Sequence, residues 1–215
     1  MNKLLSLDSP LMQKLTMLGE LIVLSVLTIL LSLPVITAGA AICALYNAVW
    51  HIHTREGRPI RDYWRSFCSN LPKATLIWLP VLITGLMLGY GAVLVLAIPE
   101  SDLQAWKIPL LIGFFFWLMI FCWIFPLQSR FENSFKQTLI NSILCAIRFF
   151  PRTLILCVVN LLPFALLWYN AQFFLVFGTL WFFVWPALAA YWNIWILSKP
   201  FEELISMIGT EDQSA

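Results

Sequence analysis

The chain has 215 residues, of which 61% are hydrophobic and only 11% are charged. Soluble domains carry about 25% charged residues, so this composition excludes an ordinary soluble fold. The formal net charge of +2 says little by itself, because the positions of the charges matter more, and we expect no nucleic acid as a partner.

Uncharged stretches dominate the chain. Four of them, residues 21–50, 74–99, 108–129 and 153–198, contain no Asp, Glu, Lys or Arg. An apolar run of about 18 residues or more is a candidate membrane-spanning helix. These runs are too long and too uniformly apolar for the strands of a membrane barrel, which alternate over roughly ten residues. The sequence therefore predicts an all-α, multi-pass helical bundle that forms one membrane domain in the lipid bilayer.

The first residues have two possible roles. Leucines at helical spacing over residues 3–14 predict an amphipathic lead-in at the membrane surface. The region also resembles an export signal, because Lys3 and Lys14 precede the apolar run and Ala38-Gly39-Ala40 resembles a cleavage site. The apolar residues continue past that site, however, and further apolar runs follow. We therefore expect the segment to be retained in the membrane.

The run 21–50 allows two interpretations. As one helix it would be about 45 Å long, against about 30 Å of hydrocarbon. Pro34 interrupts the run, so it forms either a hairpin of two spans or one kinked span. The hairpin buries Glu20 inside its first span, where a carboxylate is costly, whereas the single span leaves Glu20 at the membrane surface.

A hairpin would also explain a small-residue pattern. Ala40, Ala44 and Ala48 recur every four residues, which gives the second helix of the hairpin a smooth face for close packing.

The distribution of charge favours the hairpin. Lysine and arginine accumulate on the cytoplasmic side of membrane proteins. With six spans, only Lys107 of the 13 Lys and Arg residues lies outside, whereas five spans leave three outside. The six expected spans are residues 11–33, 36–54, 74–98, 108–127, 153–169 and 173–197. This arrangement places the loops 55–73 and 129–152, the N-terminus and the tail 198–215 on the cytoplasmic side of the cell membrane.

Both inner loops carry an amphipathic pattern. The apolar residues are Ile60, Tyr63, Trp64, Phe67 and Leu71 in the first loop, and Phe131, Phe135, Leu139, Ile143 and Ala146 in the second. Each pattern predicts a helix that lies along the inner membrane surface and ends at a proline before the next span. The basic residues of the first loop suit either anionic lipid or a cytoplasmic partner. Its candidate docking residues are Ile60, Arg61, Trp64, Arg65 and Phe67.

An ordered set of short motifs is similar to one family. The motifs are Leu33-Pro34-Val35-Ile36-Thr37-Ala38-Gly39-Ala40-Ala41 with Ala44-Leu45-Tyr46, then Arg61-Asp62-Tyr63-Trp64-Arg65-Ser66-Phe67 with Asn70 and Lys73-Ala74-Thr75, and later Pro126-Leu127, Arg130-Phe131 and Pro151-Arg152-Thr153-Leu154. Over residues 15–197 they resemble the YesL family of bacterial membrane proteins, a domain of unknown function. Ala38 is a mild departure, because the family usually has a bulkier aliphatic residue there.

The resemblance implies a function only indirectly. The family has no established enzymatic activity. Its members are often encoded near ATP-driven carbohydrate transporters and polysaccharide-degrading enzymes. This implies an accessory role in carbohydrate uptake, with the subunits of a sugar ABC-type transporter as partners.

The sequence contains no recognisable catalytic, cofactor or metal set. It lacks GxxxxGK[ST] and HExxH motifs, and its two histidines and few acids build no Ser/His/Asp set. His51 and His53 lie on different faces of a helix, and the five cysteines have no metal-ligand spacing. We therefore predict no enzymatic activity, no cofactor and no metal, and interpret the cysteines as reduced thiols in the core.

Two patterns within the spans allow alternatives. Trp181, Trp185, Trp192 and Trp195 share one helical face, where indole rings could stack on sugars or simply contact lipid and neighbouring helices. The candidate residues of a solute path are Asn160, Trp185, Trp192 and Asn193. Gly85 and Gly89 have GxxxG spacing, which we interpret as close packing within the chain.

Three functions remain open from the sequence. The preferred one is a non-enzymatic accessory component of an ATP-driven sugar transporter. The others are a solute permease in its own right and a structural or regulatory protein that acts through lipid contact.

Overall fold

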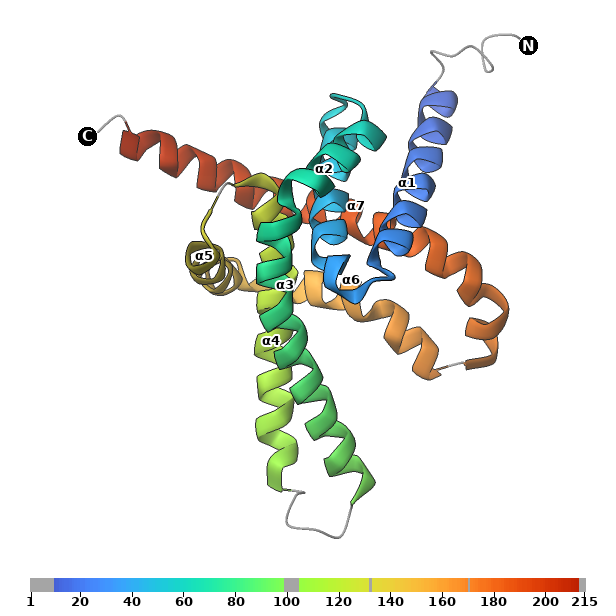
Figure 1. Cartoon of the computed structure of the whole chain (residues 1–215), viewed down its shortest axis with the longest axis vertical. Helices are drawn as coiled ribbons and strands as arrows, with labels where there is room; N and C mark the ends of the chain where they lie inside the picture. Colours follow the sequence, from blue (N-terminus) through green and yellow to red (C-terminus); the bar gives the residue numbers. More distant parts are fainter. Residues whose placement is uncertain (1–9, 99–104, 132, 170, 213–215) are drawn as a thin grey trace.

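The computed structural model describes residues 10–98, 105–131, 133–169 and 171–212, and these residues are almost entirely helical. The elements in chain order are α1 (Pro10–Ser32), the short 3-10 helix η1 (Val35–Thr37), α2 (Ala38–Thr54), α3 (Pro59–Ala97), α4 (Lys107–Arg130), α5 (Phe135–Arg148), α6 (Phe150–Tyr169) and α7 (Ala171–Asp212). Figure 1 shows that α3 and α4 form a long pair that extends away from the other helices, and that α6 and α7 run across this pair.

Several helices are long and apolar enough to cross a membrane. Four segments qualify by length and composition: Leu11–Ser32, Val35–Thr54, Pro59–Val95 and Lys107–Arg130. The pair α5 and α6 is bent by 105° and adds a fifth only if the two helices form one broken span. The predicted helical membrane class agrees with these candidates, but the described residues do not reach the predicted number of six spans.

α2 is the central helix of the molecule. It contacts α1, α3, α4 and α7. Ala40, Ala44 and Ala48 are fully buried, so the smooth face expected from their spacing is confirmed. Gly39 lies directly against Trp78 of α3. Small side chains let neighbouring backbones approach closely, which is how helices gain packing energy where lipid removes the hydrophobic driving force.

The helix α3 corrects one sequence-based expectation. We expected an amphipathic loop helix to end at Pro72 and a separate span to begin at Ala74, but a single helix runs through Pro72 and Pro80. A proline inside a helix removes one backbone hydrogen bond, and neighbouring helices can stabilise the helix despite that loss. With 39 residues, α3 is about 58 Å long, so it extends well beyond about 30 Å of hydrocarbon.

A serine of α1 compensates for another proline. Pro186 lies inside α7, where its ring disturbs the local backbone bonding. The Ser25 hydroxyl accepts a hydrogen bond from the Ala187 N–H at 3.0 Å and donates one to the Val184 carbonyl at 3.2 Å. Ser25 is fully buried. It therefore satisfies buried backbone groups of α7 and fixes α1 against α7.

The corner between α5 and α6 is held by caps and one buried threonine. Ser134 and Gln137 form a capping box at the start of α5. Pro151 is the second residue of α6, a position that tolerates proline. The Thr153 hydroxyl donates to the Ala146 carbonyl at 3.1 Å and accepts from Trp123 Nε1 at 2.9 Å. The corner is thereby attached to α4.

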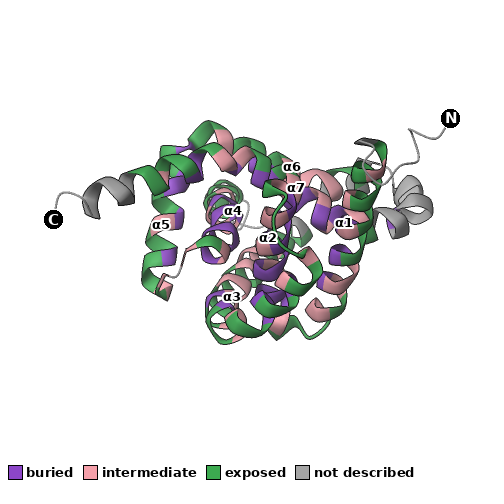
Figure 2. Ribbon diagram, turned by 90° about the horizontal axis from the view of Figure 1, so that it is seen from above, coloured by how far each residue is buried: buried purple, intermediate pink, exposed green. Residues whose placement is uncertain are grey.

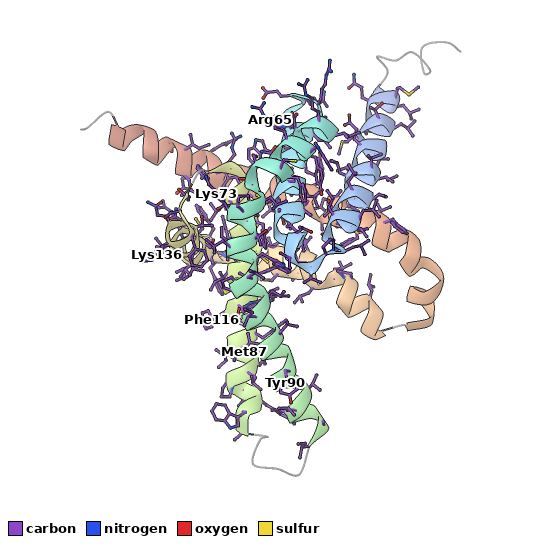
Figure 3. The ribbon with its side chains drawn as sticks, in the orientation of Figure 1. Arg65, Lys73, Met87, Tyr90, Phe116 and Lys136 are labelled. Atoms are coloured by element: carbon purple, nitrogen blue, oxygen red, sulfur yellow. The ribbon has the colours of Figure 1, made fainter. Side chains whose placement is uncertain are left out.

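Burial follows the pattern of a protein solvated by lipid. Figure 2 shows the buried residues on the faces where helices meet, and exposed residues around the outside. Large apolar side chains, including Leu86, Met87, Tyr90 and Leu111, are exposed along the free part of the α3–α4 pair. Figure 3 shows Met87, Tyr90 and Phe116 there, while Arg65 and Lys73 lie towards the opposite end of the pair. An apolar surface of this extent requires a membrane or another protein.

The α2–α3 packing can be tested by replacing Gly39 with alanine. The added methyl group would collide with the Trp78 side chain and lie 2.9 Å from the Ala74 carbonyl oxygen. Overpacking of this kind costs about 1–3 kcal/mol, so Gly39→Ala should lower the midpoint of thermal unfolding in detergent. Gly89→Ala is the matched control, because no atom lies within 4 Å of a Cβ there. Equal melting of the two variants would contradict the close contact.

Candidate functional site

A polar cavity of about 390 Å³ lies where α2, the first half of α3 and the end of α4 meet. Eleven of its twelve lining residues are polar or charged, and Phe131 is the one apolar residue among them. Because nearly all of its lining is polar or charged, we describe this cavity as the candidate site and call it the polar cavity.

α3 supplies one wall of the polar cavity. Asp62, Ser66, Ser69 and Lys73 recur at intervals of three and four residues and therefore share one face of the helix. Asn70 also lines the cavity, and its Nδ2 donates to the Ser66 hydroxyl at 3.2 Å. This wall thus consists of hydroxyl, amide and charged groups, with Lys73 at its C-terminal end.

The turn between α2 and α3 positions the acidic residue of the wall. The turn needs left-handed backbone at Arg55 (φ 57°) and Gly57 (φ 77°). A Cβ at Gly57 would lie against the Asp62 carboxylate, so glycine suits this position for a second reason. The carboxylate accepts a hydrogen bond from the Arg58 N–H at 2.8 Å.

Asp62 is also paired with a histidine of α2. His51 Nδ1 lies 3.1 Å from Asp62 Oδ2, within ion-pair distance for a protonated ring but not aligned for a hydrogen bond. Both groups contact Asp62 Oδ2: the Arg58 N–H through a hydrogen bond, and His51 as an ion-pair partner only when its ring is protonated.

The end of α4 closes the cavity. Gln128 is buried, and its Oε1 accepts a hydrogen bond from the Thr138 hydroxyl at 3.0 Å. Asn47 Nδ2 of α2 donates to the Ser129 carbonyl at 3.4 Å. The Arg130 guanidinium lies 4.7 Å from the centre of the Trp50 ring, a cation–π contact. These contacts fix the end of α4 against α2 and α5.

Positive charge predominates in the polar cavity. Arg65, Lys73 and Arg130 line it, with Asp62 as the only acid among the lining residues. Three cations against one carboxylate leave an excess of two positive charges when His51 is neutral. None of the three cations forms an ion pair with another residue in the described ranges. The cavity is therefore suited to an anion.

The candidate docking residues lie beside the cavity, at the start of α3. Ile60, Arg61, Trp64 and Arg65 are exposed and surround a shallow surface hollow together with Arg58. Phe67 is buried, and its ring stacks on that of Trp64 with 6.0 Å between the centroids. Phe67 therefore supports Trp64 from below and does not itself present a surface. Arg65 lines both the hollow and the polar cavity.

The candidate solute-path residues form two separate groups. Asn193 of α7 is only 1% exposed, and its Nδ2 donates to the Tyr46 hydroxyl at 2.8 Å and lies 3.4 Å from Asn160 Oδ1. Trp185 is buried and packs edge to face with Trp192, which is exposed on the surface. The side chain of Trp181 lies outside the described residues. The amides thus connect α2, α6 and α7 inside the bundle.

Glu20 and the five cysteines lie outside the polar cavity. Glu20 is half-buried and lines, with Lys14 and Arg55, a different cavity of about 480 Å³. Four of the five cysteines are buried, and Cys68 is exposed. No group of three or more His, Cys, Asp or Glu within the described part of the chain could hold a metal ion.

Sequence reasoning missed several residues of the polar cavity. Asn47, Ser69, Gln128 and Ser129 line it but belong to no recognised motif. The one available signal was the presence of polar side chains inside uncharged runs, as at Asn47 and Gln128. Polar residues that a chain retains in a membrane segment generally face the bundle interior or a water-filled cavity.

Comparison with known families finds a match over part of the chain. The model of a family described as "Protein of unknown function, DUF624" matches residues 21–92, which include the second half of α1, all of α2 and most of α3. The description does not carry the name YesL, so that narrower resemblance stays a prediction. No curated protein and no solved structure matches the chain.

The buried amide network can be tested by a double-mutant cycle. Tyr46→Phe and Asn193→Leu each remove one partner of the 2.8 Å bond. Buried hydrogen bonds between membrane helices contribute about 0.6–1.7 kcal/mol, so each variant should unfold more readily in denaturing detergent, and the double variant should lose less than the sum. Trp195→Phe on the exposed surface is the control. Fully additive losses would contradict a direct interaction.

Proposed function

We propose that this chain is a non-enzymatic membrane protein that docks a subunit of an ATP-driven sugar transporter and assists carbohydrate uptake. The observation that carries the proposal is the exposed surface at the start of α3, where Ile60 and Trp64 lie between arginines. We call it the docking surface, and it comprises Arg58, Ile60, Arg61, Trp64 and Arg65.

The chemistry of the docking surface supports a protein partner. Trp64 is 54% exposed, although a lone tryptophan in water gains nothing from such exposure. Tryptophan and arginine are enriched among the residues that dominate binding energy at protein interfaces. Phe67 fixes the orientation of the Trp64 ring by stacking beneath it. Three arginines make the surface positive, so the complementary surface is expected to be acidic.

The proposal includes an orientation in the membrane. The inner side carries the α2–α3 turn and both chain termini, because cationic residues accumulate on the cytoplasmic side. Six spans, with residues 153–169 and 173–197 as the last two, produce this arrangement. The first turns of α3 then extend past the hydrocarbon and bring the docking surface to the cytoplasm, where transporter ATPases are located.

A solute permease receives less support. Of its candidate path residues, Asn160 and Asn193 are hydrogen-bonded to protein groups inside the bundle. The Asn193 amide nitrogen connects α7 to α2 and α6, and its side chain is buried, so this pair presents little surface to a sugar.

The orientation can be tested by cysteine accessibility. With Cys68→Ser, the four remaining native cysteines are all buried. Glu56→Cys, in the turn between α2 and α3, should react with a membrane-impermeant maleimide only after the cells are opened. Ala105→Cys, next to the start of α4, should react in intact cells. The reverse labelling pattern would overturn the proposed orientation.

The docking surface can be tested by recovery of transporter subunits. We expect the tagged chain, purified from native membranes in mild detergent, to retain permease or ATPase subunits that crosslinking with mass spectrometry identifies. Trp64→Ala should reduce their recovery about tenfold, since loss of a central interface residue typically costs more than 1 kcal/mol.

The matched control is Trp106→Ala. Trp106 is 59% exposed, close to the 54% of Trp64, but it lies at the opposite end of the α3–α4 pair. Its replacement should leave recovery unchanged. Repeated purification of the chain alone, or equal loss from both variants, would refute the docking role.

A further inference from the structure

We propose that the polar cavity binds a phosphate ester whose organic part carries several hydroxyl groups. Free sugar phosphates and the headgroups of anionic glycerol phospholipids share this chemistry. The inference concerns a site next to the docking surface and holds whether or not a transporter subunit binds there.

The charges at the cavity select an anion. Arg65, Lys73 and Arg130 come from two different helices and are all exposed at the cavity, while Oδ2 of the Asp62 carboxylate already accepts a hydrogen bond from the Arg58 N–H. The end of α4 contributes roughly half a negative charge from its free carbonyls, which is small beside three full cations. Arginine and lysine are the usual side chains that recognise phosphate.

Neutral polar groups beneath the cations select hydroxyl groups on the ligand. Ser66 and Gln128 are both buried, so the inner part of the cavity is polar as well as its rim. The amide oxygen of Gln128 already accepts a hydrogen bond from the Thr138 hydroxyl, so the NH₂ group of Gln128 is the part that can donate to a ligand. Accumulation of cations on the inner membrane side accounts for each basic residue singly. It does not account for a polar interior beneath them.

The volume of the cavity leaves room for a ligand larger than a bare phosphate. At about 390 Å³ it falls in the range of roughly 300–1,000 Å³ that is typical of small-molecule sites. Phe131 is its single apolar lining residue, so acyl chains or aromatic rings have little to contact inside. A phosphate with a polyhydroxyl body of about monosaccharide size satisfies the charge, the polarity and the volume together.

Binding by the full-length chain in neutral detergent provides the test. Glucose 6-phosphate is the free probe and glucose is its uncharged counterpart, with isothermal titration calorimetry as the readout. In a second arm, native mass spectrometry counts phosphatidylglycerol retained from nanodiscs, with phosphatidylcholine as the comparison. Binding of glucose 6-phosphate identifies a soluble ligand, and selective retention of phosphatidylglycerol identifies a lipid headgroup.

Variants connect binding to the cavity. Lys73→Gln and Arg130→Gln should each weaken binding, at least fivefold, of whichever anionic probe the wild-type chain binds. Lys73→Arg should retain binding because the charge is conserved. Lys136→Gln is the control, since Lys136 is an exposed cation on α5 that does not line the cavity. Arg65 is left unchanged because it also belongs to the docking surface, so failure of one proposal stays distinguishable from failure of the other.

Two results would overturn the inference. One is the absence of binding in both arms. The other is binding that Lys73→Gln and Arg130→Gln leave at the wild-type level, or that Lys136→Gln reduces equally, because the ligand would then respond only to general surface charge. Thermal unfolding of each variant without ligand separates loss of binding from loss of the fold.

Discussion

The apolar character of most of this chain, whose helices are long enough to cross a membrane, is the constraint on which its structure depends. An unpaired backbone N–H or C=O group in hydrocarbon costs several kcal/mol, so the long uncharged runs must be helical. The same constraint acts where the helices are imperfect. Pro186 disturbs α7, and the backbone beside it is satisfied by the Ser25 hydroxyl from a helix 162 residues away in sequence from Ala187. Ser25 shows that a polar side chain inside this protein can have a structural role, as a hydrogen-bond partner of another helix, without binding a ligand.

Close packing around α2 is the second determinant of the fold. Lipid offers apolar contact everywhere, so helices associate where small residues let their backbones approach. Gly39, Ala40, Ala44 and Ala48 create such a surface, and α2 contacts α1, α3, α4 and α7. The polar cavity follows from this arrangement, because α2 brings Asn47 and His51 between α3 and the end of α4.

Periodicity in the sequence predicts faces of single helices but not which faces meet. The alanine face of α2 and the helical class followed from spacing and composition alone. The polar cavity did not, since Asn47, Ser69 and Gln128 belong to three helices whose relative positions depend on tertiary packing. The continuity of α3 through Pro72 was also missed. Proline has a strong local preference to end a helix, and the sequence around Pro72 carries no signal that the helix continues.

The two proposed surfaces share one residue, and this has an electrostatic consequence. Arg65 lines both the polar cavity and the hollow of the docking surface. Charges separated by less than about 10 Å are only partly screened at 0.1 M salt. An anion bound beside Arg65 would therefore lower the positive potential that an acidic partner experiences. If both proposals hold, occupancy of the cavity weakens docking, and by thermodynamic reciprocity a docked partner weakens anion binding by the same factor.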